Sequence, residues 1–189
     1  MKITAAIPAH PARVRNGMLQ RAIDSVYQQT HPAAALSVAL DLDREGAPAT
    51  RQRALDQVQT PWVAFLDSDD YWLPNHLEAL SQWAEEQHAD YVYSYWTGAA
   101  DVLGHFGKVF DPANPTETTM TILIRTELAK QVGFKALEDR KENTGEDYRL
   151  LLGCIELGAK IVHLPLRSWV WNHHSGNTSG LPTKGDARL

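Results

Sequence analysis

Apolar runs that suit strands alternate with segments of helical periodicity through the first 90 residues of the chain. The expected strands are Lys2–Ile7, Leu36–Leu42 and Trp62–Leu66, and the expected helices are Met18–Tyr27, Ala49–Val58 and a segment after Pro74. Three such units in succession predict an α/β fold, with one mostly parallel sheet and helices on both faces. Ligands of such sheets bind beyond the carboxyl ends of the strands. We therefore expect the functional site where Pro8, Asp41 and Asp67 lie.

The second half of the chain is less regular, and shorter elements are expected there. The expected strands are 90–95, 106–110, 120–124, 160–164 and 167–171, and the expected helices are 126–132 and 146–157. Lys135–Gly145 is highly charged and has no periodicity, which predicts a mobile loop. Because no internal repeat is present, residues 1–180 are expected to form a single domain, followed by a flexible tail at 181–189.

Composition excludes several classes of protein. The chain has 189 residues, a net charge of -5 and no cluster of Lys and Arg, which argues against a nucleic-acid surface. Its single cysteine, Cys154, excludes a disulfide framework and a multi-cysteine zinc site. No apolar stretch approaches the ~18 residues that a membrane-spanning helix needs. The segment Met1–Pro8 lacks the layout of a signal peptide, so we expect a cytoplasmic protein without a membrane span.

Asp67-Ser68-Asp69-Asp70 is the most informative polar segment. Its three carboxylates follow an apolar strand directly and repel one another unless a cation lies between them. Mg²⁺ and Mn²⁺ prefer oxygen ligands and often bind through one or two carboxylates together with substrate phosphates. A solvated turn whose carboxylates face the start of the next helix is the alternative. The buried character of the preceding strand favours the metal site.

The chain resembles the family 2 glycosyltransferases of the GT-A fold in four segments. Phe65–Pro74 (FLDSDDYWLP) is similar to the family's strand, DxD motif and helix start. Ile7–His10 and Leu19–Thr30 resemble its first strand, loop and helix. Gly145–Tyr148 resembles its acidic segment, and His174–Ser179 its C-terminal histidine element. The four matches occur in the family's order and together extend over most of the chain.

The resemblance implies a set of residues that bind the nucleotide sugar. Asp41 would accept a hydrogen bond from the nucleobase, with Asp43 as the alternative, and Arg51 would face the diphosphate. Asp67 would face the ribose or hold the metal through water. The residues so assigned to the nucleotide sugar are Pro8, Ala9, Asp41, Arg51, Asp67, Ser68 and Asp69.

The resemblance also implies a metal site and a catalytic base. Asp69 would bind Mn²⁺ or Mg²⁺ directly, and His174 would be a further ligand, with His173 as the alternative. Adjacent histidines on a strand point to opposite faces, so at most one of them can join the site. Asp147 would be the general base that takes the proton of the acceptor hydroxyl. Because Asp147 lies in the first turn of its expected helix, the helix dipole favours its ionised form.

These roles together describe a metal-dependent, inverting glycosyltransferase of the hexosyltransferase type. The expected donor is a nucleotide-diphosphate sugar, with a UDP-sugar as the first candidate, and no acceptor is indicated. A metal ion and an arginine would stabilise the charge that develops on the diphosphate leaving group. The chain has no Gln-x-x-Arg-Trp element and no membrane helix, so a non-processive enzyme is expected.

Three other functions remain open at this stage. An Asp-dependent phosphatase also places Asp-x-Asp after an apolar strand, but it normally has Thr or Val where this chain has Tyr71, and it uses the first strand. A sugar nucleotidyltransferase needs a glycine-rich loop after the first strand, whereas Pro8–Gly17 has glycine only at its end. A non-catalytic sugar-nucleotide-binding module would need no base at Asp147.

Aromatic residues offer a second source of sugar contacts. Trp62 and Trp83 fit apolar faces and are expected in the core, whereas Trp72 and Trp96 are candidates for stacking on a sugar ring or base. The acceptor side is expected between Thr97 and Thr118 and in the loop Lys135–Gly145. The remaining histidines are expected to be structural or solvated: His10, His31, His76, His88, His105 and His163.

Overall fold

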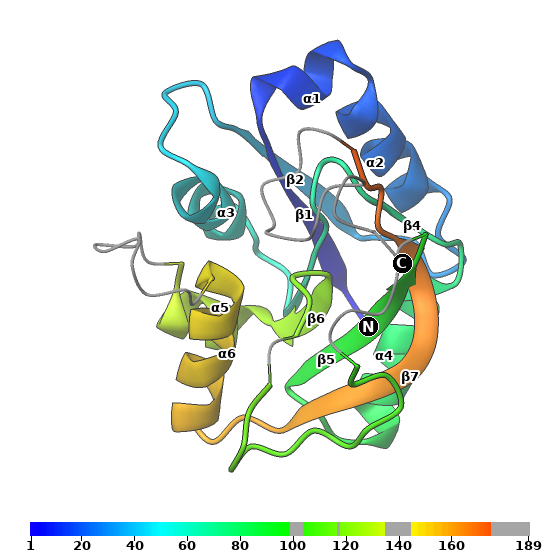
Figure 1. The fold of residues 1–189 in the computed structure, drawn as a ribbon, viewed down its shortest axis with the longest axis vertical. Coiled ribbons are helices and arrows are strands. Elements are labelled where there is room, and N and C mark those ends of the chain that lie inside the picture. Colours follow the sequence, from blue (N-terminus) through cyan, green and yellow to red (C-terminus); the bar gives the residue numbers. More distant parts are fainter. Residues whose placement is uncertain (99–103, 117, 135–144, 175–189) are drawn as a thin grey trace, which may run out of the picture.

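The computed structural model describes residues 1–98, 104–116, 118–134 and 145–174. Their strands form one seven-stranded sheet in the order β2-β1-β3-β6-β5-β7-β4 (Figure 1). The strand bounds are β1 Ile3–Ala9, β2 Ala35–Leu40, β3 Trp62–Phe65, β4 Tyr71–Trp72, β5 Tyr91–Thr97, β6 Ile122–Arg125 and β7 Ile161–Val170. The three strands predicted in the first half of the chain are therefore neighbours in the sheet.

Most strands of the sheet point the same way. β1 pairs in parallel with both β2 and β3, and β5 pairs in parallel with β7. β6 is antiparallel to β3 and β5, and β4 is antiparallel to β7. Because β6 reverses direction between them, β3 and β5 point the same way. The carboxyl ends of β1, β2, β3, β5 and β7 consequently lie along one edge, which confirms the predicted mostly parallel sheet.

Helices cover both faces of the sheet, as the alternating pattern predicts. The helix bounds are α1 Pro11–Arg15, α2 Met18–Tyr27, α3 Ala47–Asp56, α4 His76–Glu86, α5 Thr126–Val132 and α6 Glu146–Glu156. α3 packs on β1 and β2, and α5 contacts both α3 and α6 (Figure 1). α2 packs beside β4, and α4 packs on β5, β6 and β7.

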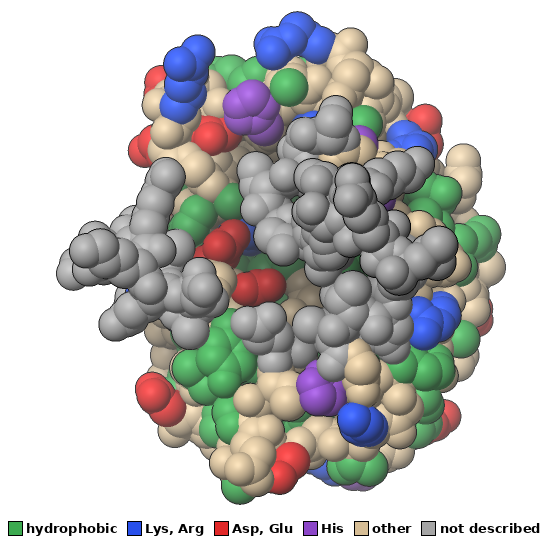
Figure 2. All heavy atoms as spheres, in the orientation of Figure 1, with side chains coloured by type: hydrophobic (Ala, Val, Ile, Leu, Met, Phe, Trp, Pro, Cys, Tyr) green, Lys and Arg blue, Asp and Glu red, His purple; other side chains and the backbone are tan. Residues whose placement is uncertain are grey.

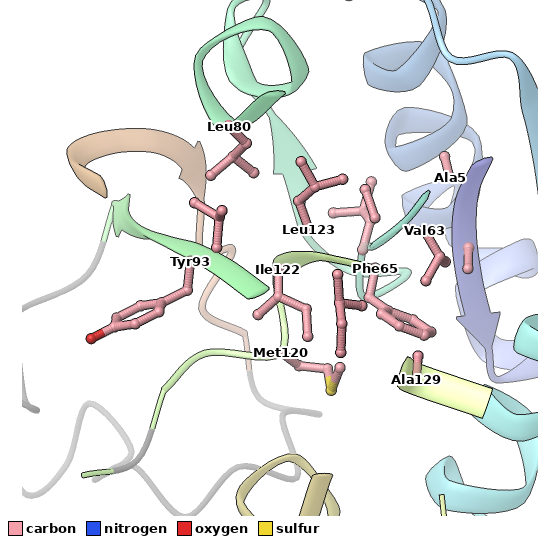
Figure 3. Close-up of a cluster of buried hydrophobic side chains, with 14 of the residues drawn as sticks. Ala5, Val63, Phe65, Leu80, Tyr93, Met120, Ile122, Leu123 and Ala129 are labelled. Atoms are coloured by element: carbon pink, nitrogen blue, oxygen red, sulfur yellow. The ribbon is translucent and has the colours of Figure 1, made fainter. Parts of the chain in front are cut away.

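The core lies on both sides of the central strands. Figure 3 shows Leu123 of β6 directed toward Leu80 of α4, while its neighbour Ile122 lies on the opposite side with Met120. This arrangement follows from the alternation of side chains along a strand. Phe65 is fully buried and meets the ring of Phe134 edge to face, with ring centroids 5.3 Å apart. Apolar burial on both faces thus fixes the strands whose ends form the polar edge.

The tryptophans are more deeply buried than the sequence suggests. Trp62 lies in the core as predicted, and Trp83 is partly buried against the core. The prediction that Trp72 or Trp96 stacks on a substrate is wrong, because their side chains are 2% and 0% exposed. Trp72 stacks on His76, and Trp96 lies in a strand flanked on both sides by other strands. Because both rings are buried in the core, neither of them can contact a ligand at the surface.

Two short elements escaped the sequence analysis. α1 follows β1 at once, with Pro11 in its first turn and the His10 ring accepting a hydrogen bond of 3.2 Å from the Ala12 backbone N–H. Proline suits the first turn of a helix because its missing N–H would be unpaired there anyway. β4, directly after the acidic segment, consists of two residues, too few to show a pattern.

Three expected strands differ in the structure. Residues 106–110 form turns and irregular backbone instead of a strand. The two strands predicted at 160–164 and 167–171 are one strand, β7, which continues through Pro165. Its register against β5 shifts between Tyr93 and Tyr95, so an irregularity accommodates the proline without breaking the strand.

Several histidines have the structural roles that were expected of them. His76 is fully buried, and its Nδ1 atom lies 2.7 Å from the Ser168 hydroxyl. Burial lowers the pKa of His76 to about 3, so this imidazole stays neutral. His163 is also buried, and its ring stacks on Tyr93 with the ring centroids 4.9 Å apart. These rings belong to the core and not to the polar edge.

Candidate active site

The polar segments singled out in the sequence meet at the carboxyl edge of the sheet. Asp41 comes directly after β2, and its backbone N–H donates to the carbonyl of Ala9 at the end of β1, over 2.8 Å. Asp67–Asp70 follows β3, and His174 follows β7. Figure 2 shows acidic side chains near the centre of one face of the molecule. The fold thus brings together residues that are far apart in the sequence.

One half of the edge is organised by Arg51, and we call Arg51, Asp67 and Glu146 the Arg51 cluster. The guanidinium of Arg51 on α3 donates to the Asp67 carboxylate over 2.6 Å and also to the Glu146 carboxylate. The side chain of Arg51 is only 9% exposed. Burial by itself would lower the pKa of Arg51, but the carboxylates of Asp67 and Glu146 raise that pKa above its ordinary value. Arg51 therefore links the acidic segment to the start of α6 as a permanent cation.

The Nε–H of Arg51 has no hydrogen-bond partner among the described residues. A buried donor without a partner costs about 1–3 kcal/mol, so such groups usually meet a ligand or water. The sequence assigned Arg51 to the diphosphate, whereas its two terminal nitrogens are bound to carboxylates. Nε is the buried nitrogen of Arg51 that has no partner in the described part of the chain, so its N–H is a group available to a ligand oxygen.

The other half of the edge is organised by Asp69, and we call Asp69, Arg13 and His174 the Asp69 cluster. An Nη2 atom of Arg13 on α1 lies 2.9 Å from the Asp69 carboxylate. Nε2 of His174 lies 3.0 Å from the same carboxylate oxygen. Arg21 on α2 donates to the backbone carbonyl of Asp69 over 3.0 Å. Arg13 and Arg21 offset the negative charge of the acidic segment from one side.

The Asp69 cluster has the donor chemistry of a divalent-metal site. A carboxylate oxygen of Asp69, after β3, and an imidazole nitrogen of His174, after β7, lie 3.0 Å apart. Mg²⁺ and Mn²⁺ accept such ligands and complete their coordination with substrate phosphates and water. Within the described ranges, no group of three or more His, Cys, Asp and Glu side chains is spaced to hold a metal ion. The donor set of Asp69 and His174 is thus compatible with a site that a phosphate ligand completes.

Asp70 is a site residue that the motif analysis did not single out. Its carboxylate is buried and accepts a hydrogen bond of 2.9 Å from the backbone N–H of Asn172. Burial, followed by the nearby charge of Asp67, raises the pKa of Asp70 well above its ordinary value. Asp70 anchors the segment that leads from β7 to His174. The third carboxylate of the acidic run was the only sequence signal for this role.

Asp41 and Asp43 differ in their surroundings. The Asp41 carboxylate is buried and accepts hydrogen bonds from the backbone N–H groups of Glu45 and Gly46, over 2.8 and 3.1 Å. Asp43 is exposed in the same loop. Asp41 therefore shapes the loop that joins β2 to α3, and it keeps lone pairs for a further donor. Of the two candidates for a nucleobase contact, Asp41 has the fixed position.

Asp147 lies in the first turn of α6, as predicted. One of its carboxylate oxygens accepts a hydrogen bond of 2.9 Å from the backbone N–H of Tyr148. The dipole argument alone suggested a lowered pKa, but burial raises the pKa of Asp147 above its ordinary value. A carboxylate with a raised pKa is a stronger base than an exposed one. The Arg51–Glu146 contact holds this turn against the acidic segment.

The smaller residues assigned to the nucleotide sugar are buried beside the charged ones. Pro8 and Ala9 are buried at the end of β1, next to β2 and β3. Ser68 is 6% exposed, within the turn closed by the hydrogen bond from the Asp70 N–H to the Asp67 carbonyl. Their contacts with a nucleotide stay predictions. Residues 135–144 of the expected loop Lys135–Gly145 and the expected tail 181–189 lie outside the described residues, and the boundary of the domain at residue 180 also stays a prediction.

Comparison with known proteins identifies the family. The model of "Glycosyl transferase family 2" matches residues 37–141, which include the acidic segment, Asp41 and Arg51. The chain belongs to glycosyltransferase family 2. This assignment sets aside the phosphatase and the nucleotidyltransferase as alternatives. The resemblance expected from the sequence is confirmed.

Two curated proteins of bacteria are similar to this family 2 chain. The succinoglycan biosynthesis protein ExoW of Rhizobium meliloti (strain 1021) is 32% identical over 133 residues, which are 56% of this chain and 41% of ExoW. WfaP of Escherichia coli, named a UDP-Glc:alpha-D-GlcNAc-diphosphoundecaprenol beta-1,3-glucosyltransferase, is 27% identical over 145 residues, 71% of this chain and 55% of WfaP. The chain thus spans about half the length of these relatives.

Solved structures of TarS from S. aureus share the fold of this family 2 protein. TarS 1-349 in complex with UDP-GlcNAc aligns with a TM-score of 0.72 at 19% identity, over 94% of this chain and 60% of that one. The complex of TarS 1-349 with UDP aligns with a TM-score of 0.70 at 19% identity, over 90% of this chain and 60% of that one. The predicted GT-A fold is thereby confirmed. Among the described residues, no helix has both the length and the apolar character to cross a bilayer.

Proposed function

We propose that this family 2 glycosyltransferase moves a hexose from a UDP-sugar to an acceptor hydroxyl, with inversion and without processivity. The observation that carries the proposal is the double contact of Arg51 with Asp67 and Glu146, because it sets the turn that holds Asp147 beside the acidic segment. Donor-binding groups and a candidate base are thereby adjacent at one edge of the sheet. The expected location in the cytoplasm stays a prediction.

The choice of a UDP-sugar is supported by the relatives. The name of WfaP specifies UDP-Glc as donor, and TarS has been crystallised with UDP and UDP-GlcNAc. In the proposed site, Asp41 accepts from the uracil ring beside Pro8 and Ala9, Asp67 and Ser68 lie near the ribose, and the Arg51 Nε–H faces the diphosphate.

The proposed reaction is a single displacement at the anomeric carbon of the donor sugar. Asp147 takes the proton of the acceptor hydroxyl while the hydroxyl oxygen bonds to the anomeric carbon. The bond between that carbon and the diphosphate oxygen breaks, and UDP leaves with the electron pair. Asp69 and His174 would hold Mn²⁺ or Mg²⁺, which supplies positive charge to the leaving diphosphate. Burial of Asp147 suits it to this role because its raised pKa increases its basicity.

Nucleotide binding tests the proposal directly. The melting temperature is measured with UDP, GDP, dTDP, CDP or ADP, each with Mn²⁺ or with EDTA, for wild type and Asp69→Asn. A ligand at a hundredfold excess over its dissociation constant stabilises the folded state by ~2.7 kcal/mol. We expect a shift with UDP and Mn²⁺ that disappears in EDTA and in Asp69→Asn.

Asp56→Asn is the matched control, since Asp56 is an exposed carboxylate at the end of α3. It should respond to UDP as wild type does. If no nucleoside diphosphate raises the melting temperature, or if Asp69→Asn responds like wild type, the proposed donor site is wrong.

A further inference from the structure

Arg13 has no role in the sequence analysis, yet it is the cation nearest to the metal-binding candidate. Its Nη2 atom lies 2.9 Å from the Asp69 carboxylate, and the two side chains are 15% and 18% exposed. The same carboxylate oxygen lies 3.0 Å from His174 Nε2. The positive charge of Arg13 thus lies beside the two proposed metal ligands, Asp69 and His174.

A divalent cation and the guanidinium of Arg13 compete for the same carboxylate. Two positive charges beside one carboxylate also repel each other. The ion pair of Asp69 with Arg13 must therefore weaken or separate when a metal ion binds. α1 favours such a movement because it has only five residues and none of them is buried.

The group to which Arg13 would move follows from the chemistry of its guanidinium. Divalent cations such as Mg²⁺ bind through one or two carboxylates together with substrate phosphates, so a cation on Asp69 would bring a diphosphate beside this carboxylate. Arg13 lies 2.9 Å from the same carboxylate and would then have the diphosphate within reach of its donors. Arginine binds such a group in bidentate fashion.

We propose that Arg13 is an exchangeable counter-ion: it pairs with Asp69 in the donor-free site and transfers to the donor diphosphate when a divalent cation binds Asp69. The inference rests on the proposed function, because it assumes that Asp69 binds the cation of a nucleotide-sugar site. It adds a diphosphate-binding residue that neither the sequence motifs nor Arg51 supplies. Arg51 cannot exchange in this way, since two carboxylates hold its buried guanidinium.

The experiment compares Arg13→Gln with wild type in two titrations. Mn²⁺ alone is titrated into nucleotide-free protein, and UDP is titrated at saturating Mn²⁺, both by calorimetry. Without the competing guanidinium, Arg13→Gln should bind Mn²⁺ about tenfold more tightly than wild type. Without the diphosphate contact, the same variant should bind UDP about tenfold more weakly at saturating Mn²⁺. Uridine, which has no phosphate, should bind both proteins equally.

Arg15→Gln is the control, because Arg15 is an exposed arginine on the same helix. It should match wild type in both titrations. An unchanged Mn²⁺ affinity in Arg13→Gln overturns the proposal, and so does an unchanged UDP affinity at saturating Mn²⁺. If wild type binds UDP in a manner that requires Asp69 while Arg13→Gln behaves like wild type, only the exchange is wrong. If Asp69→Asn also behaves like wild type, the proposed function fails with it.

Discussion

The Arg51 cluster and the Asp69 cluster use the same chemistry in different environments. Each pairs an arginine with a carboxylate of the acidic segment, at 2.6 Å for Arg51–Asp67 and 2.9 Å for Arg13–Asp69. Arg51 comes from a ten-residue helix in contact with β1 and β2 and meets two carboxylates, whereas Arg13 comes from a five-residue helix without buried residues. We infer that Arg51–Asp67 is a structural ion pair of the site, whereas Arg13–Asp69 is an ion pair whose arginine can be displaced when a ligand binds.

Removing Arg51 should have the largest effect on stability. Arg51→Met leaves the carboxylates of Asp67 and Glu146 without their buried partner, and breaking such a pair costs about 3–5 kcal/mol. We expect a loss of this size in the free energy of unfolding, measured by urea denaturation. Arg53→Met is the control on the same helix: its exposed pair with Glu45 should contribute less than about 1 kcal/mol. Similar losses in the two variants would remove the distinction between buried and exposed pairs.

Asp70→Asn should stabilise the protein at neutral pH. The raised pKa of Asp70 means that the folded state favours the protonated carboxyl. The contribution of Asp70 to the free energy of unfolding is therefore present at low pH and is lost as the pH rises through the pKa of Asp70 in the folded state. Asn keeps the acceptor for the Asn172 N–H and removes repulsion with Asp67. We expect a gain of about 1 kcal/mol at pH 7, which raises the melting temperature by about 2–4 °C. The gain should vanish below the ordinary pKa of Asp, and a gain that persists there would contradict the charge-based explanation.

Arg13→Gln should change the stability of the donor-free protein least. The side chains of the Arg13–Asp69 pair are only 15% and 18% exposed, but the arginine comes from a helix without buried residues. Because His174 Nε2 stays 3.0 Å from the Asp69 carboxylate, we expect a contribution of about 1 kcal/mol, as for a typical hydrogen bond. Urea denaturation without nucleotide or metal should therefore place this variant within about 1 kcal/mol of wild type. A loss comparable to that of Arg51→Met would show that Arg13 is a structural residue and would remove the contrast between the two clusters.

The arrangement of the edge could be predicted because parallel strands end together. Asp41 and Asp67 follow strands with clear apolar patterns, so their meeting place follows from the topology. The approach of His174 to Asp69, 105 positions apart, was expected from the family resemblance and not from any local pattern. The contact of Arg51 with Glu146 could not be predicted, since it depends on how α3 packs relative to α6.

The rest of the site escaped prediction for similar physical reasons. α1 is too short to show helical periodicity, so Arg13 had no predicted neighbour. Asp70 was grouped with the metal-binding acids, whereas its partner is a backbone N–H at Asn172, 102 positions away. Trp96 was a candidate for stacking on a ligand, but β6 and β7 lie on either side of β5 and the ring of Trp96 is buried.

Turnover of Asp147→Asn tests the central claim, that this edge transfers a sugar from a nucleotide donor with Asp147 as the base. UDP release from UDP-glucose and UDP-GlcNAc is measured with Mn²⁺ and a panel of sugar acceptors, beside UDP affinity by calorimetry. We predict that the variant loses about 10²- to 10⁴-fold in turnover rate while its UDP affinity stays within about threefold of wild type. Equal turnover in the two proteins would show that Asp147 is not the base. UDP binding by wild type without turnover of any donor would show a binding module instead of an enzyme.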